Sequence, residues 1–337
     1  MSWLPGVLQR RFLEARMRKG VTAVALAAVM VVTAACGGGG GGSEPGRTEI
    51  TVNIVPFTPN AVLFLGMEKG MFDERGITLE LQNAASPVPV VASLVAGQAD
   101  FGFVTTPVLI NANREGTAIK CVAPIDGQIS ADRDASALVA AAGSGIDSLD
   151  DLSGKSVAVV QLASINLIGA KKMIEDAGSR GTEYIAMPFP QMPQALADGR
   201  VDAAVITSPY LETALADGAV ALAHPSSDLF PNGTVYCYAA TAQYLAENAA
   251  VAQGFHDAME EAILYAKDHE DEALATLVEH LDLTPEQAKA QVIPTNYVPE
   301  INLDSIAAIQ DLMAQQGSIP STVNPADLVW QPGGGSS

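Results

Sequence analysis

Eleven polar or aromatic side chains stand just after the strands that the sequence predicts, where a bound molecule could reach them. The carboxyl ends of parallel strands meet at one edge of a sheet, so we expect these side chains to gather around one site. A helix that opens at such a turn also offers unpaired N–H groups and the positive end of its dipole. Hydroxyl, amide and aromatic groups in that setting predict binding of a small organic molecule. They are Phe57, Thr58, Asn60, Ser86, Thr105, Thr106, Gln161, Ser164, Asn166, Ser208 and Tyr210.

Some of these residues have a second interpretation that involves no ligand. Thr106 and Asn166 stand where their side chains could simply cap a helix. Phe57 and Tyr210 could equally pack in the core. Because aromatic residues make up only 5% of the chain, few rings are available to line a site. The other rings that could do so are Phe101, Phe103, Tyr236 and Tyr238.

The candidate turns contain no Arg or Lys, and the nearest ones in sequence are Arg114, Arg133 and Arg200. Helix N-termini alone can hold a nitrate or a sulfonate. The shortage of basic groups nevertheless favours a neutral or weakly polar, partly aromatic ligand over a highly charged anion. Asp126 and Gln128 follow another predicted strand near the expected hinge. There Asp126 is interpreted either as a solvated loop acid or as the partner of a cation.

The sequence contains no recognisable catalytic or cofactor motif. The four His residues lie outside the candidate turns, and three of them fall along helices of the tail without the i, i+4 pairing of metal ligands. No G-x-S-x-G elbow, P-loop or C-x-x-C is present. The six glycines at 37–42 follow no strand, so they are not a phosphate loop. We therefore predict no catalytic residue, no metal and no cofactor.

The elements that must position the candidates alternate in two blocks. In the first, strands at 48–57, 76–82, 99–106 and 118–125 alternate with helices at 59–72, 87–98 and 107–116. In the second, strands at 155–161, 183–189 and 201–207 alternate with helices at 166–178, 191–200 and 209–218. This alternation is typical of βαβ units. Strands at 135–143 and 234–241 flank the second block, and 3.6-residue spacing predicts a helical tail from 242 to about 312.

Composition limits the classes of protein to which the chain can belong. A hydrophobic fraction of 48% with 17% charged residues excludes a disordered chain. A formal net charge of −20 argues against nucleic acid as a partner, because a phosphate-binding surface needs a basic excess. A length of 337 residues exceeds what one hydrophobic core usually supports, which predicts two lobes.

The N-terminus carries an export signal. Residues 1–35 hold five basic residues and one acid, and an uncharged apolar run of about 15 residues leads to Cys36. That run is shorter than the roughly 20 residues that a membrane-spanning helix needs. The residues Thr33-Ala34-Ala35-Cys36 resemble a bacterial lipobox, in which the Cys is acylated and becomes the first residue. The alternative is an ordinary signal peptide followed by a chance Cys.

Residues 36–47 follow as a lipidated Cys and a glycine-rich tether, since six consecutive glycines behave as flexible coil. Without residues 1–35, the chain keeps 13 basic and 37 acidic residues, a formal charge of −24. Such an acidic surface is most simply a solubility feature. The exported setting permits a disulfide between Cys121 and Cys237. The favoured alternative is two separately buried thiols.

Four segments resemble one known family of binding proteins. They are "GMEKGMFDERGITLELQNA", "LVAGQADFGFVTTPVLINANREG", "SLDDLSGKSVAV" and "ALADGRVDAAVITSPYLETAL", in that order along residues 48–245. Each is similar to a motif of the NMT1/THI5-like, SsuA-like substrate-binding proteins of ABC importers, the nitrate, sulfonate and thiamine-precursor group. Together the four segments are specific for the family, but they say little about the ligand.

The resemblance implies an α/β, type II periplasmic-binding-protein fold with two mixed sheets flanked by helices and joined by two hinge strands. We expect lobe I at 48–135 and 241–330, lobe II at 136–240 and a disordered tail at 331–337. The implied protein is a monomeric lipoprotein on the outer face of the cytoplasmic membrane. It would capture a small molecule between its lobes and deliver it to the permease and ATPase of an ABC importer. The alternatives are an enzyme of the pyrimidine- or menaquinone-biosynthesis type on the same fold and a sensor lipoprotein that does not transport.

Overall fold

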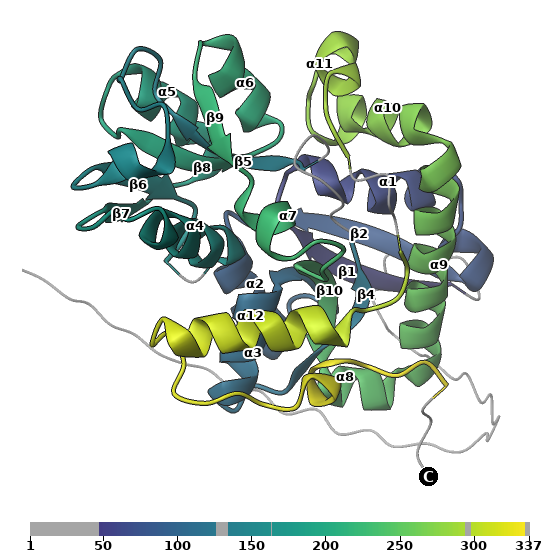
Figure 1. Cartoon of the computed structure of the whole chain (residues 1–337). Helices are drawn as coiled ribbons and strands as arrows, with labels where there is room; N and C mark the ends of the chain where they lie inside the picture. The colour runs from purple at the N-terminus through teal and green to yellow at the C-terminus, as the bar shows by residue number, and fades with distance from the viewer. Residues whose placement is uncertain (1–46, 126–133, 163, 294–297, 334–337) are drawn as a thin grey trace, which may run out of the picture. The chain divides into compact units, whose positions relative to one another are not determined.

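The computed structural model describes residues 47–125, 134–162, 164–293 and 298–333. The predicted export signal, Cys36 and the tether up to residue 46 lie outside the described residues, as do Asp126, Gln128 and the last four residues of the predicted tail. Within those ranges the chain forms two five-stranded sheets with helices against them (Figure 1). None of the helices in this part of the chain combines the length and apolar character that crossing a membrane requires.

The first sheet takes strands from two distant parts of the chain. Four come from the N-terminal block and one, β10, comes from beyond the second sheet. The strands are β1 (Thr48–Ile54), β2 (Ile77–Asn83), β3 (Phe101–Thr105), β4 (Ile119–Pro124) and β10 (Tyr236–Thr241). In the order β2-β1-β3-β10-β4, β1 pairs parallel with both its neighbours, whereas β10 is antiparallel to β3 and β4. We call this sheet and the helices against it lobe I.

The second sheet is built in the same way from the middle of the chain. Its strands are β5 (Ser136–Ala140), β6 (Ser156–Val159), β7 (Glu183–Ala186), β8 (Ala203–Thr207) and β9 (Val220–Ala223). In the order β7-β6-β8-β5-β9, β6 is parallel to β7 and β8, and β5 is antiparallel to β8. We call this sheet with its helices lobe II. The predicted two-lobed α/β architecture with mixed sheets is confirmed, and the two predicted flanking strands are the antiparallel members β5 and β10.

The helices between strands begin and end close to the predicted positions because their caps are explicit in the sequence. Thr105 and Ser164 each accept a hydrogen bond from a backbone N–H three residues later. Pro stands in the first turn of α2, α3 and α5, where its missing N–H costs nothing. These helices are α1 (Ala61–Glu68), α2 (Pro87–Val95), α3 (Thr106–Arg114), α4 (Ile165–Asp176), α5 (Met192–Ala197) and α6 (Tyr210–Ala216).

Two elements of lobe II have no counterpart among the predicted ones: strand β9 and helix α7 (Pro225–Leu229). β9 is a four-residue edge strand whose first two side chains are exposed, so it lacks the alternation that marks a half-buried strand. α7 is held by tertiary contacts rather than by periodicity. It packs against α4 where a Cβ on Gly169 would lie 2.7 Å from the carbonyl oxygen of Pro225.

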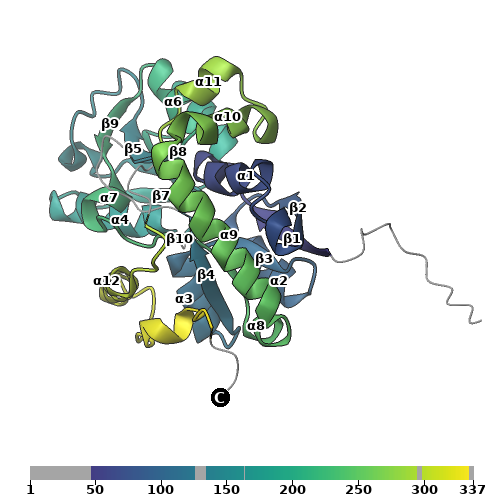
Figure 2. The same ribbon diagram turned by 90° about the vertical axis from the view of Figure 1, so that its right-hand side faces the viewer.

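The tail is helical, as predicted, and covers lobe I. α9 buries a face of small and apolar side chains, including Ala258 and Phe255, and runs across the sheet as Figure 2 shows. α12 lies between α3 of lobe I and α4 of lobe II, where the Gln316 amide donates to the carbonyl of Ile168 at 2.9 Å. The tail helices are α8 (Ala242–Glu247), α9 (Ala249–Asp268), α10 (Glu270–His280), α11 (Pro285–Lys289) and α12 (Leu303–Gln315).

The two cysteines of the described chain are free thiols. Cys121 on β4 and Cys237 on the adjacent β10 are both fully buried and not bonded to each other. Burial raises the pKa of the Cys121 thiol, and a hydrogen bond with the Cys237 side chain adds to this effect. The favoured interpretation of buried thiols is confirmed, with the correction that they are neighbours rather than separate.

Candidate functional site

A small cavity lies where side chains of both lobes meet. Its unfilled space is about 330 Å³, of which only about 20 Å³ admits the centre of a water-sized sphere. That is room for a single ordered water and not for an organic molecule. Lobe I contributes Val55, Phe57, Pro87, Phe103, Thr105 and Tyr236, and lobe II contributes Val160, Ser164, Ile165, Asn166, Phe189 and Thr207. The two lobes therefore meet around a small, mainly apolar space.

Three rings of lobe I form one side of the cavity. Phe57 and Phe103 meet edge to face with ring centroids 4.7 Å apart, and Tyr236 lies 5.8 Å from Phe57 and 5.5 Å from Phe103. Each ring is at least 94% buried, so the cluster is anchored in the core while its edge borders the cavity. Edge-to-face pairs of this kind are worth about 0.5–1.5 kcal/mol beyond the area they bury. The cluster is thus a fixed, preformed apolar surface.

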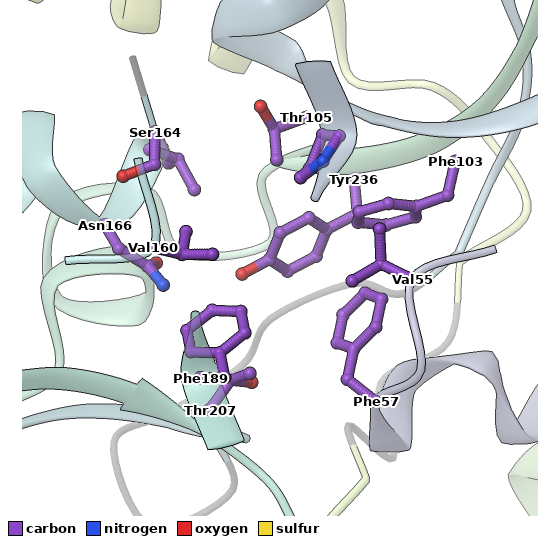
Figure 3. Close-up of a pocket in the computed structure, with 12 residues that line it drawn as sticks. Val55, Phe57, Phe103, Thr105, Val160, Ser164, Asn166, Phe189, Thr207 and Tyr236 are labelled. Atoms are coloured by element: carbon purple, nitrogen blue, oxygen red, sulfur yellow. The ribbon is translucent and has the colours of Figure 1, made fainter. Parts of the chain in front are cut away.

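Lobe II supplies the opposite side, with one ring and the polar groups of a helix start. Phe189 follows β7 and lies across the cavity from Phe57, as Figure 3 shows. Asn166, in the first turn of α4, accepts a hydrogen bond from Ser226 through its amide oxygen at 3.1 Å. Its amide nitrogen and the Tyr236 hydroxyl point toward one another across the cavity (Figure 3). The Asn166 amide and the Tyr236 hydroxyl therefore bring polar groups of both lobes together in a mainly apolar site.

The position of the lobe I wall depends on close packing behind it. A Cβ on Gly102 of β3 would lie 2.2 Å from Cγ1 of Val90 on α2. Glycine at this position lets α2 lie directly on the sheet, and that contact sets where Pro87 reaches the cavity.

Four of the predicted candidates line the cavity: Phe57, Thr105, Ser164 and Asn166. They come from three different turns and from both lobes, as the strand-end argument anticipates. Thr105 and Ser164 also cap α3 and α4, so the capping and site interpretations hold together for these positions. Asn166 is not the cap of α4, since Ser164 fills that position.

Three other candidates of lobe I form hydrogen bonds within the core and do not line the cavity. The Thr58 hydroxyl donates to Gln291 at 2.9 Å, and the Thr106 hydroxyl donates to the carbonyl of Thr234 at 2.6 Å. Asn60 donates to the carbonyl of Val55 and accepts from the Tyr238 hydroxyl at 2.7 Å. These side chains lie one position past a lining residue or within the following helical turn. Their polar atoms are directed into the protein and hold the turn in place.

The remaining candidates also lie away from the cavity lining. Ser208 is fully buried and donates to Glu212 at 2.6 Å, while Tyr210 packs half-buried against one of the lobe II cores. Ser86 precedes the lining residue Pro87, and Gln161 follows the lining residue Val160. Neither Ser86 nor Gln161 is itself among the lining residues.

Sequence reasoning missed Phe189 and Thr207, as well as the aliphatic lining. The predicted strand 183–189 extends past the end of β7 at Ala186, which hid Phe189 as an aromatic residue that follows a strand. Phe57 is a candidate because it is an aromatic residue just after a strand. With the end of β7 placed at Ala186, the same rule also selects Phe189. Thr207 is the last residue of β8, and its hydroxyl donates to the carbonyl of Ala135. Of the rings considered, Phe101 and Tyr238 belong to the core, where Phe101 stacks on Phe255 at 4.1 Å.

Two carboxyl groups, that of the buried Asp134 and that of the partly buried Glu212, stand near the junction of the lobes without lining the cavity. Asp134 accepts hydrogen bonds from the backbone and hydroxyl of Ser136 and from the backbone of Ser227, at 2.9–3.0 Å. Burial raises its pKa, although these hydrogen bonds act in the opposite direction. Burial likewise raises the pKa of Glu212, whose Oε2 is buried without a hydrogen-bond partner. Next to this pair, the backbone N–H of Thr58 donates to the carbonyl of Ser208 at 3.2 Å, a direct contact between the lobes.

Among the described residues, one group of side chains could hold a metal ion, and it lies outside the cavity. His256, Asp257 and Glu260 of α9 have ligand atoms within 4.8 Å of one another. His256 and Glu260 are an i, i+4 pair that a search for His alone overlooks. The Nδ1 atom of His256 is hydrogen-bonded to the carbonyl of Val122 at 2.8 Å. The expected absence of a metal stays a prediction.

Comparison with known proteins places the chain in a family. The family described as NMT1/THI5 like matches residues 58–273. A putative aliphatic sulfonates-binding protein of Escherichia coli (strain K12) is 28% identical over 210 residues, which cover 59% of this chain and 63% of that protein. The match therefore spans less than two thirds of that relative.

Solved structures with the same fold come from several bacteria. The ligand-binding component of an ABC-type import system from Staphylococcus aureus, with zinc bound, has a TM-score of 0.72 at 16% identity over 84% of this chain and 97% of that one. The alkanesulfonate-binding protein SsuA from Xanthomonas axonopodis pv. citri, bound to MOPS, has a TM-score of 0.71 at 19% identity over 86% and 99%. These neighbours have the periplasmic-binding-protein fold. Since the family match spans well over half of the chain, this protein belongs to the NMT1/THI5-like family.

Proposed function

We propose that the protein is an extracytoplasmic solute-binding lipoprotein that captures a small organic molecule between its lobes and delivers it to an ABC importer. The observation that carries this proposal is the cavity itself, which has the ring cluster of lobe I on one side and Phe189 and Asn166 of lobe II on the other. A site divided between two lobes binds its ligand most tightly when the lobes are together. Ligand binding therefore stabilises the closed arrangement.

The narrowness of the cavity supports this cycle. With room for about one water, a ligand can enter only if the lobes move apart. The contacts that must loosen include the Thr58–Ser208 backbone hydrogen bond, the Gln316–Ile168 hydrogen bond and the packing of Ile165 and Ile168 into the lobe I core. A permease that recognises the closed arrangement would distinguish the loaded protein from the empty one.

The cavity proposal is tested by filling the cavity from the lobe II side. Val160→Trp places a large ring in the space, so the lobes cannot close on a ligand. Val220→Trp makes the same change on the half-exposed edge strand β9 and serves as the control. We expect the first variant to lower the uptake of the solute that co-purifies with wild type by at least about tenfold, a loss of 1.4 kcal/mol in binding. Equal uptake by the two variants would contradict the proposal, and solute binding without any uptake by wild-type cells would favour a sensor.

Retention at the membrane is a second part of the proposal. We propose that Cys36 carries the lipid after removal of residues 1–35, that residues 36–47 act as the tether and that the lobes comprise 48–135 with 241–330 and 136–240. Cys36→Ala removes the acceptor thiol and should release the protein from the membrane fraction of cells labelled with a radioactive fatty acid. Cys121→Ala changes a buried thiol and should leave labelling intact. Label on the Cys36→Ala protein would contradict the anchoring proposal.

A further inference from the structure

The helix that opens at Thr105 cannot offer its N-terminus to an anion. The first three residues of α3 are Thr106, Pro107 and Val108. The N–H of Thr106 donates to the carbonyl of Val235, Pro107 has no N–H, and the N–H of Val108 donates to the Thr105 hydroxyl. Every donor of this first turn is therefore absent or already used within the protein.

The helix that opens at Pro87 is similarly poor in donors. Pro87 and Pro89 occupy the first and third positions of α2 and have no N–H, which leaves Val88 as the one donor of that turn. The Val88 side chain is 50% exposed at the edge of the site, next to the lining residue Pro87. A single backbone N–H does not form the converging set of donors that anion binding at a helix end requires.

Of the three helix starts compared, that of α4 in lobe II keeps two donors. The N–H of Leu167 donates to Ser164, but those of Ile165 and Asn166 have no acceptor among the described residues. The Asn166 side chain adds its amide nitrogen, because its oxygen already accepts from Ser226. One edge of the cavity can therefore donate hydrogen bonds to an acceptor, either a carbonyl or ring nitrogen or the oxygen of an anion.

No charged side chain lines the cavity among the described residues. A net charge of −24 beyond residue 35 also disfavours the approach of an anion. A buried cation would need a carboxylate at the site to offset its desolvation. The carboxyl groups of Asp134 and Glu212 accept hydrogen bonds from other protein groups and do not line the cavity.

From the absence of a charged side chain among the described lining residues and from the four rings that line the cavity, we infer that the substrate is an uncharged molecule with a flat ring. Its ring packs between the Phe57–Phe103–Tyr236 cluster and Phe189, and an acceptor on its edge receives hydrogen bonds from Asn166 and the start of α4. This inference rests on the proposed function and names its substrate class. It separates the protein from the relatives named above for sulfonates, whose ligands carry a full negative charge.

Three probes of similar size and different charge test the inference: benzamide, benzoate and phenyltrimethylammonium. Calorimetric titration of the full chain should give a dissociation constant for benzamide at least about tenfold lower than for either ion, and it should not change with salt concentration. Tighter binding of benzoate or of the cation would overturn the inference of an uncharged substrate and leave the proposed solute binding standing. If none of the three binds, ring recognition is overturned, while the uptake of the co-purified solute by Val160→Trp cells still decides the proposed function.

Two variants assign the contacts. Asn166→Asp keeps the shape but replaces the donor with a negatively charged acceptor, and should weaken benzamide binding about tenfold. Thr213→Asp adds the same charge on the exposed face of α6 and should leave binding unchanged. Phe189→Leu keeps an apolar side chain but removes the flat face, and should also weaken binding about tenfold. Wild-type affinity in both Asn166→Asp and Phe189→Leu would overturn the proposed contacts, provided that circular dichroism shows both variants folded.

Discussion

The two lobes have the same kind of sheet but different interiors. Lobe I has one large core, and its cavity rings Phe57, Phe103 and Tyr236 belong to that core. Lobe II has two smaller cores, one on each face of its sheet, in which alanine and valine predominate. Phe189 belongs to one of these thin cores. The difference makes lobe I the larger apolar surface at the cavity and lobe II the lighter part, which supplies the hydrogen-bonding groups of Asn166 and the start of α4.

The same contrast appears at the junction. Ile165 and Ile168 of α4, in lobe II, pack into the core of lobe I, so the helix that carries Asn166 is seated on the larger lobe. The entry into lobe II depends instead on hydrogen bonds to one carboxyl group, Asp134, which joins β5 to α7. Apart from the cavity-lining residue Phe189, we therefore expect core substitutions to affect binding only in lobe I. Polar substitutions should have their largest effect on stability at the lobe II junction.

The largest effect should come from Phe103→Ala. Removing a buried ring should cost about 3–5 kcal/mol of unfolding free energy, and ligand binding should weaken as well, because the ring supports Phe57 at the cavity. Ile206→Ala in a lobe II core should cost about 2–4 kcal/mol and leave the affinity of the folded protein unchanged. Urea unfolding and calorimetry measure the two quantities. An equal loss of affinity in both variants would remove the distinction between the lobes.

Asp134→Ala should have the next largest effect and lower the free energy of unfolding by about 3 kcal/mol. The substitution leaves two backbone N–H groups and a hydroxyl without their acceptor in a buried site. Asp134→Asn keeps one acceptor oxygen but turns an N–H group toward the backbone of Ser227, and should cost about half as much. Urea unfolding followed by circular dichroism measures both values. If Asp134→Ala is as stable as wild type, the junction does not depend on this carboxyl group.

Glu212→Gln should change the free energy of unfolding by less than the substitutions above, and should raise it instead of lowering it. Burial raises the pKa of Glu212 above its usual 4.5, so its ionised form is disfavoured in the folded protein. Wild type therefore loses stability as the pH rises from 4.5 through the raised pKa, whereas the neutral amide does not. We expect the variant to be about 1 kcal/mol more stable than wild type at pH 8 and no more stable at pH 4. Thermal melts at both pH values measure this difference, and a constant gap would show that ionisation is not its cause.

Reducing agents should have no effect on stability. Cys121 and Cys237 are buried free thiols on neighbouring strands of lobe I, so dithiothreitol has no bond to break. The melting temperature should be the same with and without it, and a thiol-reactive dye should label these two residues only after unfolding. A lower melting temperature in dithiothreitol would instead indicate a disulfide in the core of lobe I.

The sequence alone predicts the alternation of strands and helices and the cavity's location at strand ends, because caps, prolines and apolar periodicity act locally. Phe57, Thr105, Ser164 and Asn166 follow from that local information. What it cannot predict is the direction of a side chain just past a strand. Thr58 and Thr106 lie next to lining residues, yet tertiary partners, Gln291 and Thr234, direct their hydroxyls inward.

Aliphatic lining residues give no signal of their own, because Val55, Val160 and Ile165 are indistinguishable in sequence from ordinary core. The edge strand β9 gives no clear strand signal for the converse reason, since half of its side chains face solvent. Phe189 lay within reach of the strand-end rule and was hidden only by an error of three residues in the end of β7.

The most direct test of the account is native mass spectrometry of the full chain extracted from membranes in detergent. The account predicts one small uncharged molecule per wild-type chain, retained in Val220→Trp and lost in Val160→Trp. Equal occupancy in Val160→Trp would place the ligand outside the cavity between the lobes. An anion in the wild-type protein would contradict the assignment of an uncharged substrate.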